Sequence, residues 1–205
     1  MTAIDDFFTH YYARRPVNAT FTGVHTYDDR LPDWSPDGLA AMDGEMRSLG
    51  EALAREYPSP ASVGAFRNNP DLLDAELARG FLEVQRAENA SLHGPRGNPA
   101  LWTGEATFSI IALMIRDFAP PEARADVAEH RAKRTGGFLS RHVGTPVPRR
   151  WVDRAARDCE GAAVLLADGV RRWTAALDLS ASRATDVLNA AAGASRCLSE
   201  FADSL

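Results

Sequence analysis

The chain has 205 residues, of which 45% are hydrophobic, and it carries a formal net charge of −5 at pH 7. This length and composition suffice to bury a hydrophobic core, and the acidic balance argues against a general nucleic-acid binder, which would carry a basic field. The N-terminus shows no secretory signal pattern, and the most apolar run, residues 108–115, is too short to span a bilayer. We therefore expect a cytoplasmic protein that binds neither nucleic acid nor membrane.

The first half of the chain has the periodicity of amphipathic helices. In the first helix, Asp5 or Asp6 is expected to cap the N-terminus, and an aromatic face follows. Ser35-Pro36 and Asn69-Pro70 are N-cap and first-turn signals for helices over residues 36–57 and 70–89. Apolar residues at three- and four-residue steps predict the buried face of each. For the first helix these residues are Phe7, Phe8, Tyr11 and Tyr12, and for the helix over 70–89 they are Leu73, Leu77, Phe81 and Val84.

The second half is also helical. Residues 93–99 are expected to form a loop because of their Gly and Pro content. Residues 103–118 read as the most buried helix, residues 122–142 as a polar helix interrupted at Gly136-Gly137, and residues 148–177 as a long helix. Ser180 or Ser182 opens the last helix. Because no stretch alternates with a period of two, we predict an all-α fold, an irregular bundle of about six to eight helices in a single domain over residues 1–205 with no significant sheet.

Arginines follow one face of the helix predicted over residues 122–142. Arg124, Arg131, Arg134 and Arg141 are spaced by seven, three and seven residues. This spacing is most simply a solvated face, which could oppose an acidic partner surface.

Sequence motifs for catalysis are missing from the chain. There is no His-Glu-x-x-His, no phosphate-binding loop and no Gly-x-Ser-x-Gly, and no two of the five histidines are four residues apart. Cys159 and Cys197 follow no metal or redox spacing and read as free thiols. Asp6 and His10 could orient one another as an acid–base pair, although a surface ion pair is the simpler interpretation. We therefore assign no catalytic residue, metal ligand or cofactor to this chain.

The stretch GVHTYDDRLPDWSP, residues 23–36, has the composition of a site. His25, Asp28 and Asp29 could ligate a cation, but the spacing of a calcium loop is absent. A structural role is the favoured interpretation, in which Asp28 and Asp33 bond backbone N–H groups in Asx turns and Arg30 pairs with either of them. An ordered, charged loop is also typical of a pocket rim. The candidates for contact with a substrate in a cleft are His25, Tyr27, Asp28, Arg30 and Trp34.

Residues 7–41 resemble the start of the bacterial family called domain of unknown function 885. The matching positions are Pro16, Ala19, Thr20, Gly23, His25, Tyr27, Asp28, Leu31, Pro32, Asp33 and Ser35. NPALWT (98–103) and PVPRRWVDRA (146–155) are also similar to the family, though less specific. Its members resemble helical zinc metallopeptidases of gluzincin type, with the metal-binding motif in a C-terminal half that has no counterpart here. The resemblance thus implies zinc for full-length relatives and none for this chain.

Two functions follow as hypotheses. The first is the non-catalytic N-terminal region, or a truncated relative, of a peptidase-like protein, forming one wall of a substrate cleft. It predicts a C-terminal catalytic segment or self-association as partner, a peptide-like ligand, and exposed apolar surface on the last helices. The alternative is a self-sufficient helical binding or interaction module without catalysis, with a closed core.

Overall fold

The computed structural model describes residues 1–59 and 64–205, and its elements are helical throughout these residues. The predicted all-α class is therefore confirmed. Seven helices have twelve or more residues and three shorter ones connect them, so the prediction of six to eight matches the longer helices. In chain order the elements are α1 (Ala3–Arg14), α2 (Pro16–Thr22), η1 (His25–Tyr27), α3 (Pro36–Glu56), α4 (Gly64–Asn68), α5 (Pro70–Ala90), α6 (Pro99–Met114), α7 (Pro121–Leu139), α8 (Arg149–Val164), η2 (Leu165–Gly169), α9 (Val170–Ala176) and α10 (Ala181–Ser204).

Helix starts follow local cap chemistry. Ser35-Pro36 and Asn69-Pro70 begin α3 and α5 as predicted, with the cap side chain accepting a backbone N–H bond. Asn98-Pro99 begins α6 in the same way, so the expectation that Pro99 lies in a loop is wrong. The cap of α1 is Thr2, not Asp5 or Asp6. Asp5 completes the capping box from the third helical position.

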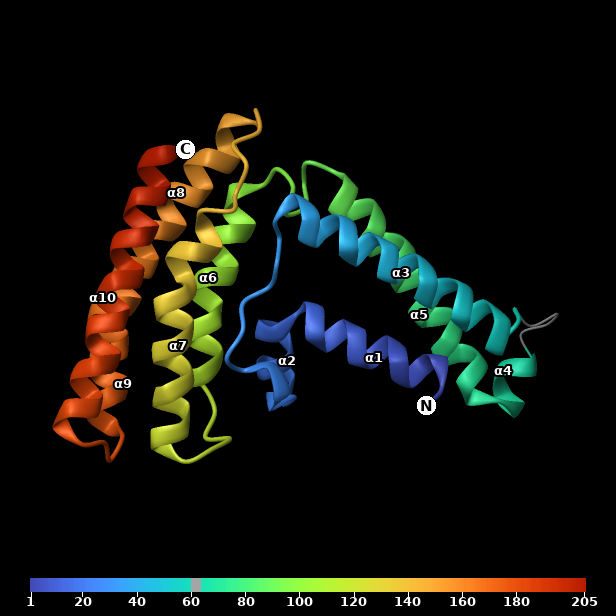
Figure 1. Ribbon diagram of the computed structural model, residues 1–205, viewed down its shortest axis with the longest axis horizontal. Coiled ribbons are helices and arrows are strands. Elements are labelled where there is room, and N and C mark those ends of the chain that lie inside the picture. The colour runs from blue at the N-terminus through green and yellow to red at the C-terminus, as the bar shows by residue number, and fades with distance from the viewer. Residues whose placement is uncertain (60–63) are drawn as a thin grey trace.

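The helices form two groups with separate hydrophobic cores (Figure 1). One core lies among α1, α3 and α5, and the other among α6 to α10. The loop between α2 and α3 runs between the two groups, and Trp34 on this loop packs against both cores. No helix in the described part of the chain combines the length and apolarity needed to cross a bilayer.

The buried face of α5 differs from the predicted one. Phe81 is half-buried against Phe7 and Tyr11, but Leu77, the most exposed member of the predicted stripe, has 63% of its surface exposed. The residues that α5 buries are Ala75, Ala78 and Leu82. Small alanines allow α5 to approach α3 closely, and the bulky stripe at Leu73, Leu77 and Val84 is left facing outward. On α1, Phe7 is buried but Phe8 is about half exposed.

Gly136 and Gly137 do not interrupt α7, which runs unbroken from Pro121 to Leu139. A Cβ on Gly136 would lie 2.8 Å from the Sγ atom of Cys197 on α10, whereas Gly137 faces open space. Gly136 therefore permits the close packing of α7 against α10 and is not a break in the helix.

The expectation of exposed apolar surface on the last helices is wrong for α10, whereas Val164 on α8 has 62% of its surface exposed. Leu198 and Phe201 of α10 are buried, and so is Val187 nearer the start of the same helix. They pack into the core formed by α6 to α10. The long helix predicted over residues 148–177 consists of three consecutive helical segments, α8, η2 and α9. The middle segment, η2, is a short stretch of π-helix.

Candidate functional site

The loop between α2 and α3 begins at a left-handed residue. Gly23 ends α2 with φ at +98°, a conformation that glycine adopts without steric cost. The chain then makes the short helix η1 and an extended passage to Ser35. Asp33 accepts bonds from the backbone N–H and the hydroxyl of Ser35, an Asx turn that leads into α3 as predicted for this residue.

Asp28 is the buried polar residue of this loop. One carboxylate oxygen accepts the Thr20 hydroxyl at 2.5 Å, and the other lies 2.9 Å from Nδ1 of His25. The His25 ring stacks face to face on Phe118, with centroids 4.0 Å apart. Asp28 therefore ties η1 to α2 through side chains, where the sequence had indicated bonds to the backbone.

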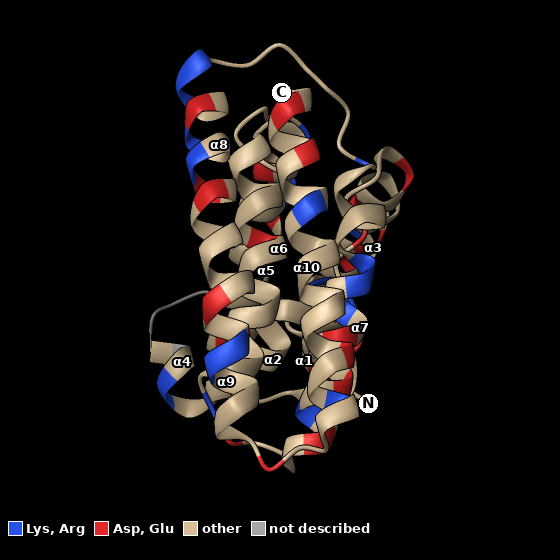
Figure 2. Cartoon of the chain, turned by 90° about the vertical axis from the view of Figure 1, so that its left-hand side faces the viewer, with Lys and Arg blue, Asp and Glu red and all other residues tan. Residues whose placement is uncertain are grey.

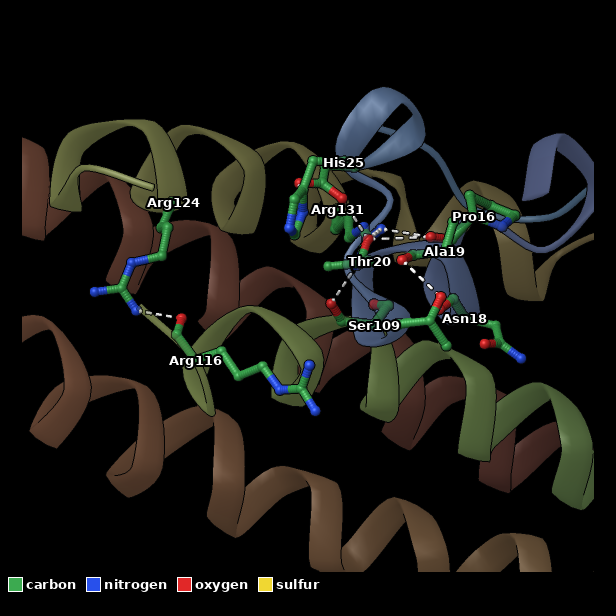
Figure 3. A network of polar contacts seen from close by, with 11 residues as sticks. Pro16, Asn18, Ala19, Thr20, His25, Ser109, Arg116, Arg124 and Arg131 are labelled. Carbon is green, nitrogen blue, oxygen red and sulfur yellow. Dashed lines mark hydrogen bonds and ion pairs between the residues drawn. The ribbon is translucent and has the colours of Figure 1, made fainter. Parts of the chain in front are cut away.

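Arg131 of α7 lies beneath this loop and is fully buried (Figure 3). Its guanidinium donates to the carbonyl oxygens of Ser109 and Pro16, at 2.8 and 3.2 Å, and to the Thr20 hydroxyl at 2.6 Å. Burial lowers the pKa of Arg131 to about 10, and Asp28 is the first of the acidic neighbours that oppose this. One charged side chain thus joins α2, α6 and α7.

The interpretation of the arginine stripe as a solvated face is wrong for Arg124 and Arg131. Arg124 is buried like Arg131, and it donates to the Arg116 carbonyl and pairs with Asp117 at 2.7 Å. Arg134 and Arg141 are about half exposed, and they pair with Asp29 and Asp33 at 3.7 and 3.3 Å. The acidic surface that this helix opposes is the chain's own loop.

The remaining cleft candidates lie toward solvent. The Arg30 guanidinium lies 5.4 Å from the centre of the Tyr27 ring, and its Nε lies 3.6 Å from Asp29. Both are surface contacts of modest energy. Arg30 therefore pairs with Asp29, and not with Asp28 or Asp33 as the sequence had indicated.

Trp34 lies where the two helix groups meet. Its ring contacts Trp102 and Phe138 at 5.4 Å between centroids, on the side of the larger core. It also packs against the core of α1, α3 and α5. Trp34 lines a cavity of about 370 Å³ with residues of α1, α2, α3, α5 and α6, a volume within the range of small-ligand pockets. The other four cleft candidates lie outside the lining of this cavity.

Glu105 of α6 lines the same cavity and was not identified from the sequence. Burial raises the pKa of its carboxyl from 4.5 to about 7, against the opposing charges of Arg131 and Arg15. Glu105 is half-buried, and none of the hydrogen bonds or ion pairs within the described residues involves its carboxyl. A sequence signal existed, because Glu105 is the single charged residue between Pro99 and Met114 in the most apolar helix. Carboxyls with such perturbed acidity are frequent at binding and catalytic sites.

Other surface depressions have less connection to the sequence-derived candidates. Asp6 and His10 line an open one of about 760 Å³ on α1 and α3, but His10 pairs with Glu45 at 3.5 Å and not with Asp6. Another of about 580 Å³ lies at the end of the α6–α10 group. On α8, arginines alternate with acidic residues and form pairs such as Arg149–Asp153, so this face carries no single sign of charge (Figure 2).

Within residues 1–59 and 64–205, no three His, Cys, Asp or Glu side chains converge in a way that could hold a metal ion. Of the cation candidates from the loop, Asp28 is engaged with His25 and Thr20, and Asp29 pairs with Arg134. Both cysteines are free, and burial raises the pKa of the Cys159 thiol to about 11, which suppresses its nucleophilic thiolate form.

Comparison of the chain with protein-family models, with curated proteins and with solved structures finds no match.

Proposed function

We propose that this chain is a helical, non-catalytic binding region whose cavity beneath Trp34 forms one wall of a cleft for a peptide-like ligand. The observation that carries the proposal is the position of this cavity at the junction of the two helix groups. Ligand sites occur preferentially at such junctions, where apolar surface and a few polar groups converge. Trp34 supplies the aromatic surface and Glu105 an unengaged carboxyl.

In this proposal the loop of residues 23–36 positions the wall and does not perform chemistry. Asp28, Asp29 and Asp33 bind the loop to α2 and α7, and this holds Trp34 over the cavity. His25, Tyr27 and Arg30 belong to the same loop but lie outside the cavity lining, so they are not assigned to the ligand contact. The free thiols support placing the protein in a reducing compartment such as the cytoplasm.

The proposed cleft wall fits two kinds of protein. The family resemblance supports a region of a larger peptidase-like protein, in which another segment supplies zinc and the rest of the cleft. The burial of Leu198 and Phe201 on α10 supports the second, a self-sufficient binding module with a closed core. Analytical ultracentrifugation separates them, because a stable monomer that binds ligand favours the module and self-association favours the larger assembly.

The test of the binding role uses nuclear magnetic resonance of the indole N–H groups. Mixtures of short peptides, some with free and some with acetylated N-termini, are titrated into the protein. The Trp34 signal, assigned by its loss in Trp34→Phe, is expected to shift on addition of either kind of peptide, while the buried Trp173 signal stays in place. If no peptide shifts the Trp34 signal, the proposed function is overturned.

A further inference from the structure

Some polar groups that line the cavity beneath Trp34 already form hydrogen bonds within the protein, and others do not. Arg14 donates to the carboxylate of Glu45, at 2.7 Å from its Nε. Arg15 donates to the Gln85 carbonyl, and its guanidinium lies 4.9 Å from the Tyr11 ring centre. The two arginines that border the cavity therefore donate to partners within the protein.

The hydrogen-bond acceptors are less engaged. Asn18 donates its amide N–H to the Tyr11 hydroxyl at 3.1 Å, and its carbonyl oxygen accepts nothing from the described residues. Asn89 is oriented likewise by a 3.3 Å contact of its amide nitrogen with the Met42 sulfur. Glu105 accepts no hydrogen bond from any described residue. A ligand that matches this cavity must therefore bring donors.

The charges around Glu105 also favour a ligand that carries a positive charge. The two cations that act on Glu105 are Arg15 and Arg131, and burial of the carboxyl outweighs both. The Arg131 N–H groups are directed at Ser109, Pro16 and Thr20. A further cation inside the cavity would stabilise the ionised carboxylate, and the face of Trp34 is a surface on which an ammonium group is also attracted.

We infer that this cavity binds a primary ammonium group, such as the N-terminal amine of a peptide, with the Glu105 carboxylate as its counter-ion and the Trp34 ring beside it. The inference deepens the proposed function and rests on it for the identity of the ligand. The ammonium ion offers three donors, which match the Glu105 carboxylate and the carbonyl oxygens of Asn18 and Asn89.

The binding of an ammonium ion here depends on pH, because Glu105 must be ionised to pair with it. Binding is expected to strengthen as the pH rises toward and past 7 and to level off above that. Other charged and titratable groups face the cavity from the elements around it. They are Arg14 and Arg15 at the α1–α2 turn, Glu88 on α5, and His93 between α5 and α6. Arg131 on α7 lies outside the lining and acts on Glu105 through its charge.

The experiment uses ethylammonium as the probe, with acetate and ethanol as probes of opposite and zero charge. The Glu105 carboxyl carbon is followed by nuclear magnetic resonance through a pH titration. Saturating ethylammonium is expected to lower the apparent pKa of Glu105 from about 7 and to shift the Trp34 indole signal. This readout uses the unaltered protein, so it does not depend on whether a variant folds.

A variant then tests the role of the carboxylate. Glu105→Gln keeps the shape and removes the charge, and it is expected to weaken ethylammonium binding about tenfold to a hundredfold. Glu83→Gln, on the exposed side of α5 and outside the cavity, is expected to leave binding unchanged.

Each other outcome decides between the two proposals. If ethylammonium leaves Glu105 and Trp34 unaffected, if acetate binds in its place, or if Glu105→Gln binds it equally well, the inference is overturned. The proposed function survives that failure when N-acetylated peptides still shift the Trp34 signal. If ethylammonium binds but no peptide does, the inference stands and the peptide-binding function fails.

Discussion

At the scale of single residues, we expect substitution of the buried Arg131 to lower the stability of the protein substantially. Arg131→Met would keep the apolar stem but remove the donors to Ser109, Pro16 and Thr20. The carbonyl oxygens of Ser109 and Pro16 would each lose a donor, and the buried Asp28 would lose a neighbouring positive charge. We expect the free energy of unfolding to fall by about 3 kcal/mol, measured by urea denaturation.

The matched control is Arg134→Met, one turn further along α7. Arg134 contacts the same loop at Asp29, but about half of its side chain is exposed. Its loss is expected to cost at most about 1 kcal/mol. Equal effects of the two substitutions would contradict the structural role assigned to Arg131.

Glu105 makes the stability of the protein depend on pH. Its pKa in the folded state, about 7, lies above the ordinary value of 4.5, so the folded state holds its proton more tightly than the unfolded state does. The resulting stabilisation is fully present below pH 4.5 and is lost as the pH rises through 7, by about 3 kcal/mol. Glu105→Gln should therefore be more stable than the unaltered protein at pH 8 and show little difference at pH 4.

This pH prediction is measured as the difference in unfolding free energy between the variant and the unaltered protein, from urea denaturation at each pH. Taking the difference cancels the titration of the other carboxyls. Glu83→Gln, exposed on α5, should give a difference that does not change with pH. A pH-independent difference for Glu105→Gln as well would show that the carboxyl is not held in a costly environment.

Residue roles were only partly readable from the sequence. The aspartates of residues 23–36 were recognised as structural, because Asp in a Pro- and Gly-bounded stretch favours turns. The partners of Asp29 and Asp33 could not be named, because Arg134 and Arg141 lie over a hundred residues away. The burial of Arg131 was missed because an arginine in an Arg-rich helix gives the same pattern whether it faces solvent or a buried cluster of carbonyl groups.

At the scale of elements, adjacent glycines of α7 provide a matched pair. Gly137→Ala faces open space and should stabilise the helix by up to about 1 kcal/mol through its higher helix propensity. Gly136→Ala would place its Cβ within 2.8 Å of the Cys197 sulfur. Overpacking of this kind costs about 1–3 kcal/mol, so a net loss of stability is expected from thermal denaturation.

The explanation for Gly136 can be tested by relief of the clash. Cys197→Ala removes the sulfur, so Gly136→Ala in that background should cost less than it does alone. If the two substitutions are additive, the close approach of α7 and α10 does not explain the glycine.

The face that α5 buries is tested by a second pair of substitutions. Leu77→Gln changes a side chain that is 63% exposed and should alter the unfolding free energy by no more than about 0.5 kcal/mol. Leu82→Ala empties a position in the core of α1, α3 and α5 and should cost about 2–5 kcal/mol. The sequence-derived stripe predicts the reverse order, so urea denaturation of both variants decides between the two faces.

The sequence predicted where helices begin better than it predicted which face of each helix is buried. Cap chemistry is local, so Ser35-Pro36 and Asn69-Pro70 were found from the sequence, and Ser180 was one of two candidates for the last helix. The face of α5 was not, because Ala75 and Ala78 count weakly in a hydrophobic pattern although they allow the closest helix packing. The burial of α10 could likewise not be predicted from a local pattern, because its partner helix α7 is distant along the chain.

At the scale of the whole molecule, the two cores are coupled through few residues. Trp34 packs against both, and Arg131 joins α2 to α6 and α7. We expect the unaltered protein to unfold in one cooperative transition, because these contacts make the loss of one core destabilise the other. Trp34→Ala should remove much of this coupling and separate the unfolding of the two helix groups.

The positions of the tryptophans make this separation measurable. After Trp34→Ala, the remaining tryptophans, Trp102, Trp151 and Trp173, all lie on α6, α8 and α9, so fluorescence follows one helix group. Far-ultraviolet circular dichroism follows helices of both groups. The two signals should coincide in urea denaturation of the unaltered protein and diverge in the variant. Trp173→Phe, within one group, should leave them coincident. Coincident transitions in Trp34→Ala would mean that the two helix groups are coupled through residues other than Trp34.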